Sequence, residues 1–164
     1  MKNICFALAH HFSERKGGAE LQADLISKSL SDFRINYLRF GLSNNPIPLV
    51  DDNVNIFGIK EPKFNIKFLN NFNTKFIHKL LDDLNSEVYY QRGFSHSDVI
   101  QKYAQLNGKK FILGISMDSQ CRPIHHKTKI KYLKNYLDYR INVNILKNAD
   151  VVITQTQHQQ NLLL

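Results

Sequence analysis

Short apolar segments alternate with longer amphipathic segments along almost the whole chain of 164 residues. The short segments are rich in β-branched and aromatic residues, so each one predicts a buried strand. The longer segments repeat apolar residues every three or four positions, which predicts helices with one buried face. Strands that alternate with helices favour a parallel sheet, because each crossover returns the chain to the same end of the sheet. We therefore expect an α/β fold with a doubly wound, mainly parallel sheet and helices on both faces.

The predicted strands cover residues 3–8, 35–40, 54–59, 87–91, 110–115 and 151–154, and the predicted helices cover residues 19–29, 66–84, 97–106, 129–146 and 157–164. Ligands of such sheets bind beyond the carboxyl ends of the strands. The segments expected at that edge are 10–18, 92–96, 116–126 and 154–158. Around helix 97–106, Ser95 or Ser97 is the expected N-terminal cap, and Gly108 is the expected C-terminal residue.

The chain is strongly basic, since 22 Lys and Arg residues against 14 Asp and Glu residues give a net charge of +8. This balance suits an anionic partner such as nucleic acid, a phosphorylated small molecule or an acidic membrane, with a merely solvated basic face as the alternative. No nucleic-acid-binding motif is present, and Tyr132, Tyr136 and Tyr139 have the spacing of a core-facing stripe. A nucleic-acid partner is therefore not favoured, whereas peripheral contact with an anionic membrane stays open.

The length suits one domain with its own core. The N-terminus enters a predicted strand without the architecture of a signal peptide, and no apolar run reaches the roughly 20 residues that span a bilayer. We expect a cytoplasmic protein, at most peripheral to the inner face of the membrane.

Cysteines and histidines are too few and too dispersed to favour a metal site. Cys5 and Cys121 form neither a disulfide framework nor a CxxC motif, and Cys5 is expected to be a buried hydrophobic residue. Two histidine pairs occur, His10–His11 and His125–His126. Adjacent side chains on an extended segment point to opposite sides, so each pair offers at most one ligand. No metal and no cofactor are expected.

The segment Gly17-Gly18-Ala19-Glu20 lies between the first predicted strand and the first predicted helix. Bare backbone N–H groups and a helix N-terminus at such a corner attract phosphate. The segment matches neither the dinucleotide-binding G-x-G-x-x-G pattern nor the Walker motif. The alternative is a plain turn in which glycine supplies a positive φ.

Three further side chains are candidates for the same edge. Asp118 follows the predicted strand 110–115, where a carboxylate can accept a hydrogen bond from a hydroxyl group or orient a sugar. Its alternative is a local cap on the backbone of Ser119 or Gln120. Arg92 is either a cation of the cleft or a member of a surface ion pair, and His10 is expected to line the cleft.

Three segments together resemble the N-terminal domain of the family-four retaining glycosyltransferases. They are the glycine segment with its helix (17–26), the pair Ser-Glu-Val-Tyr-Tyr-Gln-Arg-Gly (86–93) and Gly-Lys-Lys-Phe-Ile-Leu-Gly-Ile-Ser-Met-Asp-Ser (108–119), and Asn-Ala-Asp-Val-Val-Ile-Thr-Gln-Thr (148–156). The resemblance implies a Rossmann-like domain of the two-domain GT-B architecture. It also implies hexosyl transfer from a nucleotide sugar, a substrate rather than a cofactor, to a glycan, lipid-linked or other hydroxyl acceptor with retention.

The resemblance also assigns expected roles. Gly17 and Gly18 match a loop that approaches the donor phosphates, and Glu20 starts the helix behind it. Asp118 falls where relatives contact the acceptor or the transferred sugar, and Arg92 matches an arginine of some relatives. Ile115 departs from a frequent histidine, which speaks against a histidine-based role.

In this family the leaving diphosphate helps to take the acceptor proton, while the protein positions groups and stabilises charge. The resemblance makes residues 1–164 the acceptor-side domain of a GT-B enzyme, without the C-terminal domain that binds the donor nucleotide through a Glu-x7-Glu element. One wall of a two-domain cleft cannot clamp and desolvate a donor, so we expect no transfer by these residues alone. The alternative is a non-catalytic α/β module that binds a nucleotide, a polyanion or a protein partner.

Overall fold

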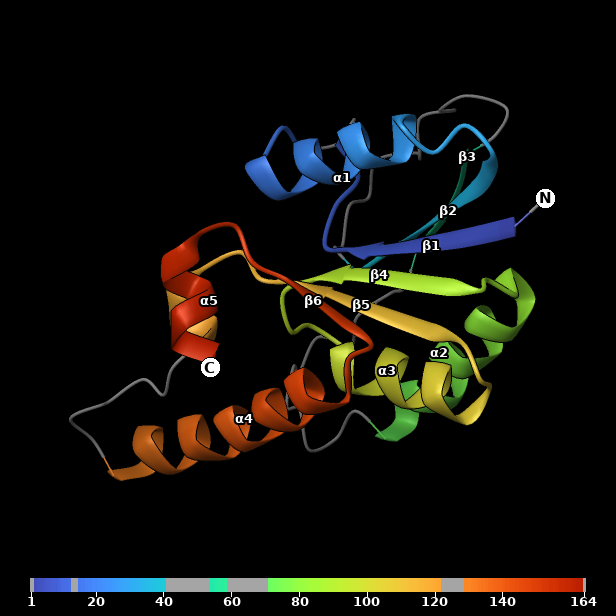
Figure 1. Cartoon of the computed structure of the whole chain (residues 1–164). Helices are drawn as coiled ribbons and strands as arrows, with labels where there is room; N and C mark the ends of the chain where they lie inside the picture. Colours follow the sequence, from blue (N-terminus) through green and yellow to red (C-terminus); the bar gives the residue numbers. More distant parts are fainter. Residues whose placement is uncertain (1, 13–14, 41–53, 59–70, 122–128, 164) are drawn as a thin grey trace.

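The computed structural model describes residues 2–12, 15–40, 54–58, 71–121 and 129–163 (Figure 1). The strands are β1 (Lys2–Leu8), β2 (Phe33–Arg39), β3 (Val54–Gly58), β4 (Val88–Arg92), β5 (Lys110–Gly114) and β6 (Val151–Ile153). The helices are α1 (Gly18–Lys28), α2 (Asn71–Leu84), α3 (Ser97–Leu106), the short 3₁₀ helix η2 (Asp118–Gln120), α4 (Lys129–Asn148) and α5 (Gln157–Leu163). Each strand and each α-helix lies where the sequence pattern predicts it, although residues 66–70 of the second predicted helix fall outside the described residues; η2 lies in a segment that the sequence pattern predicts to be an irregular loop.

Within the described residues, six strands form one parallel sheet in the order β3-β2-β1-β4-β5-β6. From β1 to β3 the chain adds strands in one direction, and from β4 to β6 it adds them in the other. The direction reverses between β1 and β4, and all carboxyl ends meet at one edge. The predicted doubly wound parallel sheet is confirmed, and its topological switch point lies between these two strands.

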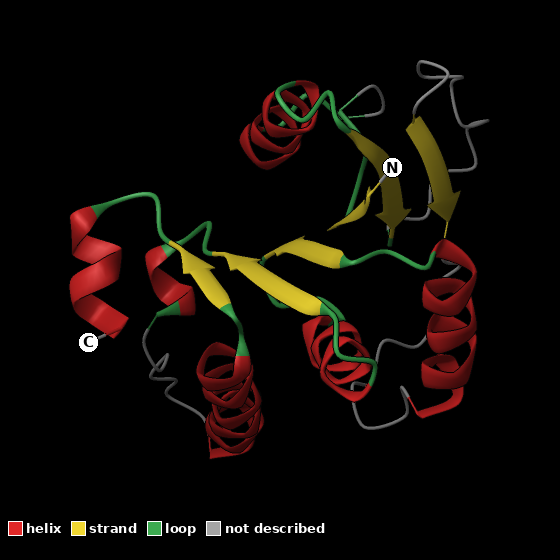
Figure 2. Cartoon of the chain, turned by 45° about the vertical axis from the view of Figure 1, so that its right-hand side comes forward, coloured by secondary structure: helices red, strands yellow, loops and turns green. Residues whose placement is uncertain are grey.

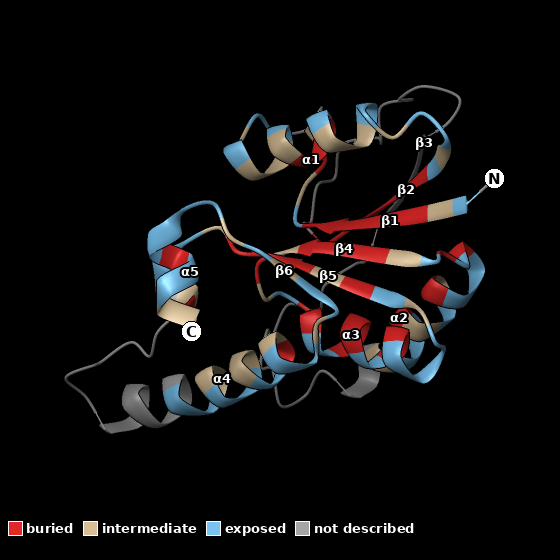
Figure 3. Ribbon diagram, in the orientation of Figure 1, coloured by how far each residue is buried: buried red, intermediate tan, exposed pale blue. Residues whose placement is uncertain are grey.

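Helices cover both faces of the sheet (Figure 2). On one face, Ala23 of α1 packs with Phe6, Tyr37 and Tyr90, whose ring centroids lie 5.4 Å (Phe6–Tyr37) and 5.2 Å (Phe6–Tyr90) apart. The opposite face carries α2, α3 and α4 over a larger core (Figure 3). That core includes the fully buried side chains Cys5, Ile77, Leu81, Tyr89, Ile100, Phe111, Leu113 and Ile145. Burial of both faces explains why the strands read as continuous apolar runs.

Of the two predictions about the ends of helix α3, the C-terminal one is confirmed and the N-terminal one is wrong. Gly108 ends the helix with φ +63°, and Lys109 N donates to Ala104 O at 2.8 Å, as in a Schellman motif. The N-cap, however, is His96 in the left-handed region with φ 55°, and no side chain caps the helix. Ser97 Oγ instead donates to the carbonyl oxygen of Gly93 at 2.8 Å. This hydroxyl therefore closes the loop after β4 and leaves the first N–H groups of the helix uncapped by a side chain.

In helix α4 the predicted core-facing tyrosine stripe is wrong at Tyr136, whereas Tyr139 is half-buried. Tyr136 is 45% exposed and its neighbour Leu137 is 54% exposed, whereas Ile145 near the other end is buried. The side chain of Tyr132 lies outside the described residues. The C-terminal half of the helix therefore provides its packing against the body of the fold. In the part of the chain that the structure describes, no helix combines the length and the apolar character needed to cross a membrane.

Candidate functional site

The carboxyl edge of the sheet brings together parts of all four predicted segments. Residues 10–12, 15–18, 92–96, 116–121 and 154–158 are described there, whereas 13–14 and 122–126 are not. The parallel register fixes this gathering, since Arg92 pairs with Gly114 and Gly114 pairs with Ile153. Segments that follow these neighbouring strands therefore start side by side.

The glycine segment forms the start of α1 without unusual backbone angles. Gly17 is the N-cap with φ −107°, and its carbonyl oxygen accepts from Leu21 N at 2.9 Å. The described glycines with positive φ are Gly93 and Gly108, so the turn with positive φ predicted as the alternative is wrong. A Cβ on Gly17 would collide with the carboxylate of Glu20, whereas a Cβ on Gly18 would have no neighbour within 4 Å. The Glu20 carboxylate thus lies against Gly17, and the space beside Gly18 is open.

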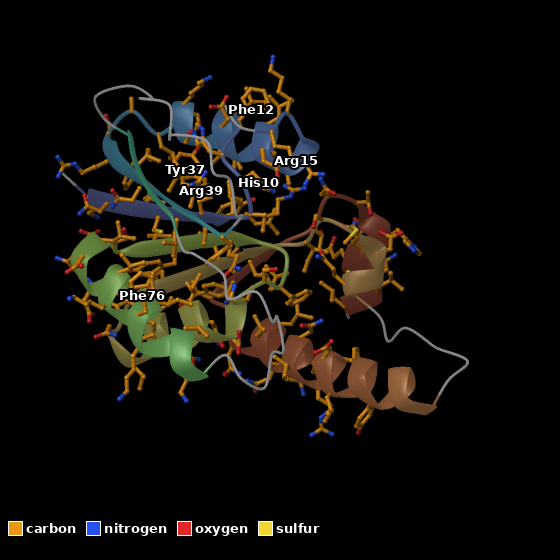
Figure 4. All side chains as sticks on the ribbon, turned by 180° about the vertical axis from the view of Figure 1, so that it is seen from behind. His10, Phe12, Arg15, Tyr37, Arg39 and Phe76 are labelled. Atoms are coloured by element: carbon orange, nitrogen blue, oxygen red, sulfur yellow. The ribbon has the colours of Figure 1, made fainter. Side chains whose placement is uncertain are left out.

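The two histidines after β1 lie in different environments, as their adjacency predicts. His11 is buried, and its ring meets the edge of Tyr37 with a centroid distance of 4.6 Å. Burial lowers the pKa of His11, although the nearby Asp24 carboxylate acts in the opposite direction. His10 is half-buried at the edge of the sheet. Figure 4 shows His10, Tyr37 and Arg39 below α1, with Arg15 beside the start of that helix.

Two arginines end strands on either side of β1. Arg39 pairs with Leu8, and Arg92 follows Gln91, which pairs with Ala7. Side chains alternate along a strand, so both arginines lie on the α1 face, two residues after Tyr37 and Tyr90 of that core. Strand spacing puts their Cα atoms about 10 Å apart. The sequence analysis identifies Arg92 but not Arg39. An arginine within a predicted strand does not by itself indicate a position at the carboxyl edge of the sheet.

Arg92 contacts the segment after β6. When the Gln155 amide is oriented to satisfy both neighbours, its oxygen accepts from Arg92 Nη2 at 2.5 Å and its nitrogen donates to Ser116 O at 3.2 Å. One glutamine thereby connects the segments after β4, β5 and β6. The partner in this contact is a neutral amide. The contact is therefore not the surface ion pair predicted as the alternative for Arg92.

Asp118 begins η2, four residues after the last residue of β5. Its Oδ1 accepts from Gln159 Nε2 at 3.1 Å, and its Oδ2 lies 3.8 Å from His158 Nε2. The predicted alternative, a side-chain cap on Ser119 or Gln120, does not describe this carboxylate, because its hydrogen bond goes to α5. The side chain is 48% exposed, so a ligand can reach it.

Three glutamines shape the site, and the sequence-based search missed all of them. Gln120 Oε1 accepts from Ser116 N at 2.8 Å and from Met117 N at 3.2 Å, while Gln155 and Gln159 make the contacts described above. Gly93 has φ +77°, and a Cβ there would lie 3.2 Å from Gln120 Nε2. Glutamine is usually an exposed residue, so nothing in its local sequence marks it as a connector.

The cysteines behave as buried thiols. Cys5 is fully buried, as predicted, and burial raises the pKa of its thiol to about 12. Burial also raises the pKa of Cys121. Among the residues that the structure describes, no three histidine, cysteine or acidic side chains gather as a metal site.

The fold defines the class of protein as a Rossmann-like α/β domain, with a doubly wound parallel sheet and helices on both faces. It is similar to MurG from Acinetobacter baumannii, with a TM-score of 0.60 and 16% identity over 94% of this chain and 41% of that chain. A protein described as a UDP-N-acetylglucosamine 2-epimerase from Listeria monocytogenes has a TM-score of 0.59 and 12% identity over 99% of this chain and 41% of that one. UDP-GlcNAc 2-epimerase from Methanocaldococcus jannaschii has a TM-score of 0.57 and 9% identity over 98% and 41%.

No protein-family model and no curated protein sequence matches the chain. The chain spans 41% of the length of each of these three structural neighbours. At identities this low, the similarity to these structures shows a shared fold and nothing further about this chain.

Proposed function

We propose that residues 1–164 form the acceptor-side domain of a glycosyltransferase that uses a nucleotide-sugar donor. One observation carries the proposal: Arg92, Ser116 and Asp118 all contact the segment after β6 at the carboxyl edge of a parallel sheet. Ligands of doubly wound sheets bind at this edge. Two of the structural neighbours have the nucleotide sugar UDP-N-acetylglucosamine in their names, which supports a nucleotide sugar as the ligand class.

The glycine segment is suited to the phosphate side of the donor. Neither the backbone angles nor packing explains glycine at position 18, because its φ is not positive and a Cβ there would meet open space. A glycine at the start of a helix lets an anion approach the backbone N–H groups and the positive end of the helix dipole. Gly17 and Gly18 therefore form the phosphate-side wall of the proposed site, and Glu20 starts the helix behind them.

The two arginines at the same edge match the charge of a diphosphate. Arg39 and Arg92 end strands on the α1 face, and His10 follows the strand between them. Donors fixed in place before the reaction stabilise negative charge on a leaving diphosphate without reorganisation. The diphosphate then helps to take the proton of the acceptor hydroxyl, and transfer proceeds with retention.

Asp118 is the proposed catalytic residue, and it orients the transferred sugar or the acceptor through hydrogen bonds to hydroxyl groups. A carboxylate that is 48% exposed and already fixed at Oδ1 offers Oδ2 to such a ligand. The proposed chemistry needs no metal or cofactor. The basic surface favours a phosphorylated acceptor or the anionic inner face of a membrane.

The test is sugar transfer by the complete gene product that contains residues 1–164, with a panel of nucleotide sugars and hydroxyl acceptors. We expect release of nucleoside diphosphate in step with a glycosylated product of retained anomeric configuration, and a loss of about 100-fold in kcat for Asp118→Ala. Residues 1–164 alone should not transfer sugar.

The second candidate function is a non-catalytic α/β module that binds a polyanion, and the net charge of +8 favours it. Binding to arbitrary oligonucleotides with a steep salt dependence, together with no donor turnover, would favour that non-catalytic module.

A further inference from the structure

Gln159 is a buried polar residue in the exposed helix α5. It is 3% exposed, whereas its neighbours His158 and Gln160 are exposed. Buried amides need hydrogen-bond partners, and Gln159 has them at both ends of its side chain. Oε1 accepts from Gln155 N at 2.9 Å, and Nε2 donates to Asp118 Oδ1 at 3.1 Å.

These two hydrogen bonds fix the orientation of the Gln159 amide. The backbone N–H of Gln155 can only donate, so it selects the oxygen of the side chain. The planar amide then turns its nitrogen toward Asp118. The main chain of Gln159 is fixed as well, because its N–H donates to Thr156 Oγ1 at 3.1 Å. The segment after β6 therefore holds a donor at one defined place above η2.

The carboxylate of Asp118 is oriented as a consequence. Oδ1 is occupied by Gln159, whereas Oδ2 lies 3.8 Å from His158 Nε2, beyond a normal hydrogen bond. Without the Gln159 donor, a side chain that is 48% exposed would be free to rotate. A fixed Oδ1 leaves Oδ2 at a constant position, while Arg92 and Ser116 contact the segment after β6 through Gln155.

We propose that Gln159 is a positioning residue, which holds Oδ1 of Asp118 so that Oδ2 faces a hydroxyl group of the sugar or the acceptor. The inference rests on the proposed function for its ligand and on the hydrogen bonds of Gln159 for its geometry. Gln159 touches no substrate in this account and acts through Asp118.

A double-mutant cycle tests the geometry without any assay of sugar transfer. Gln159→Glu keeps the acceptor for Gln155 N but places a carboxylate against Asp118. Gln159→Glu combined with Asp118→Asn restores a hydrogen bond, with the donor now on the side chain at position 118. We expect Gln159→Glu to raise the unfolding equilibrium constant in urea about tenfold in the wild-type background but less than about threefold in the Asp118→Asn background, since contacting pairs are coupled. An equal factor in both backgrounds would overturn the proposal.

A milder variant decides the same point even when Gln159→Glu does not fold. Asp118→Ala removes the acceptor from an exposed position, so the side-chain amide protons of Gln159 should exchange faster in NMR spectra. The backbone amide of Gln155 should keep its exchange rate. Unchanged Gln159 amide resonances in Asp118→Ala would contradict the contact.

Kinetics separate positioning from a structural role. In the complete gene product, Gln159→Met should lower kcat about tenfold with little change in donor KM, because orientation acts on the transition state. It should have no further effect when Asp118 is already alanine. Gln160→Met on the exposed side of α5 is the matched control and should retain kcat. Equal losses in both glutamine variants, or an unchanged kcat for Gln159→Met, would refute positioning.

A complete absence of transfer in the wild type refutes the proposed function instead. The urea cycle and the amide exchange then still decide whether Gln159 orients Asp118.

Discussion

Nε2 of Gln159 lies 3.1 Å from Oδ1 of Asp118, although 41 positions separate the two residues in the chain. Asp118 begins η2 after β5, and Gln159 belongs to α5 after β6. The hydrogen bond therefore links the segments that follow two neighbouring parallel strands. Any displacement of α5 relative to the sheet would move the carboxylate on which the proposed chemistry depends.

Gly93 and Gly18 should respond in opposite ways to alanine. Gly93 has φ +77° and would bring a Cβ within 3.2 Å of Gln120 Nε2, so Gly93→Ala should lower the free energy of unfolding by about 1–2 kcal/mol. Gly18 begins α1 in open space, and Gly18→Ala should leave stability equal or raise it by up to roughly 1 kcal/mol. Urea denaturation of both variants checks the contrast, and similar losses would count against the assigned backbone geometry.

His11 should make the fold sensitive to mild acid. Burial sets the pKa of His11 below its ordinary value of 6.5, so the unfolded chain takes up the proton first. This contribution to stability is present above pH 6.5, is lost as the pH falls below that value, and levels off once folded His11 is protonated. His11→Phe keeps an aromatic ring against Tyr37 and should flatten the stability profile in the pH range just below 6.5. An unchanged slope would show that other groups cause it.

Asp150 should act in a lower pH range. Its Oδ1 lies 2.6 Å from Lys110 Nζ, and its Oδ2 accepts from Phe111 N at 2.9 Å. The hydrogen bond from Lys110, followed by that from Phe111 N, lowers the pKa of Asp150 below 3.8. Its stabilisation is therefore present above pH 3.8 and is lost as the pH falls through the folded pKa.

Asp150→Asn tests this contribution. The variant should lower the free energy of unfolding by about 0.5–1 kcal/mol at pH 7, since it keeps an acceptor but loses the charge. The difference from wild type should shrink in acid, where the native carboxyl group is protonated. A difference that stays constant down to about pH 2.5 would contradict the charge-based explanation.

The architecture follows from the sequence because the spacing of apolar residues distinguishes helices from strands. Alternating elements and a parallel sheet leave few topologies, and the edge that carries Gly17, Arg92 and Asp118 follows from them. Contacts between distant segments are different in kind. Gln155 and Gln159 look like ordinary surface residues until the register of β5 and β6 places them beside Ser116 and Asp118.

Exposed apolar residues also escape prediction. The spacing of Tyr136 in its helix is that of a buried residue, yet the side chain is 45% exposed. Periodicity shows that a helix has an apolar face, but not how much of that face another element covers. The local conformation of Gly18 is also not visible in the sequence. Its φ is not positive, so the backbone angles alone do not require glycine at this position.

Turnover of a nucleotide sugar by the complete gene product, compared between the wild type and Gly18→Asp, tests the central claim most directly. Residue 18 has open space around it, so the variant should keep the circular dichroism spectrum and cooperative unfolding of the wild type. A carboxylate at the start of α1 would occupy and repel the proposed phosphate position, and we predict a loss of transfer of about 100-fold or more. Unchanged turnover in a folded Gly18→Asp protein, or no turnover of any donor by the wild type, would contradict the account.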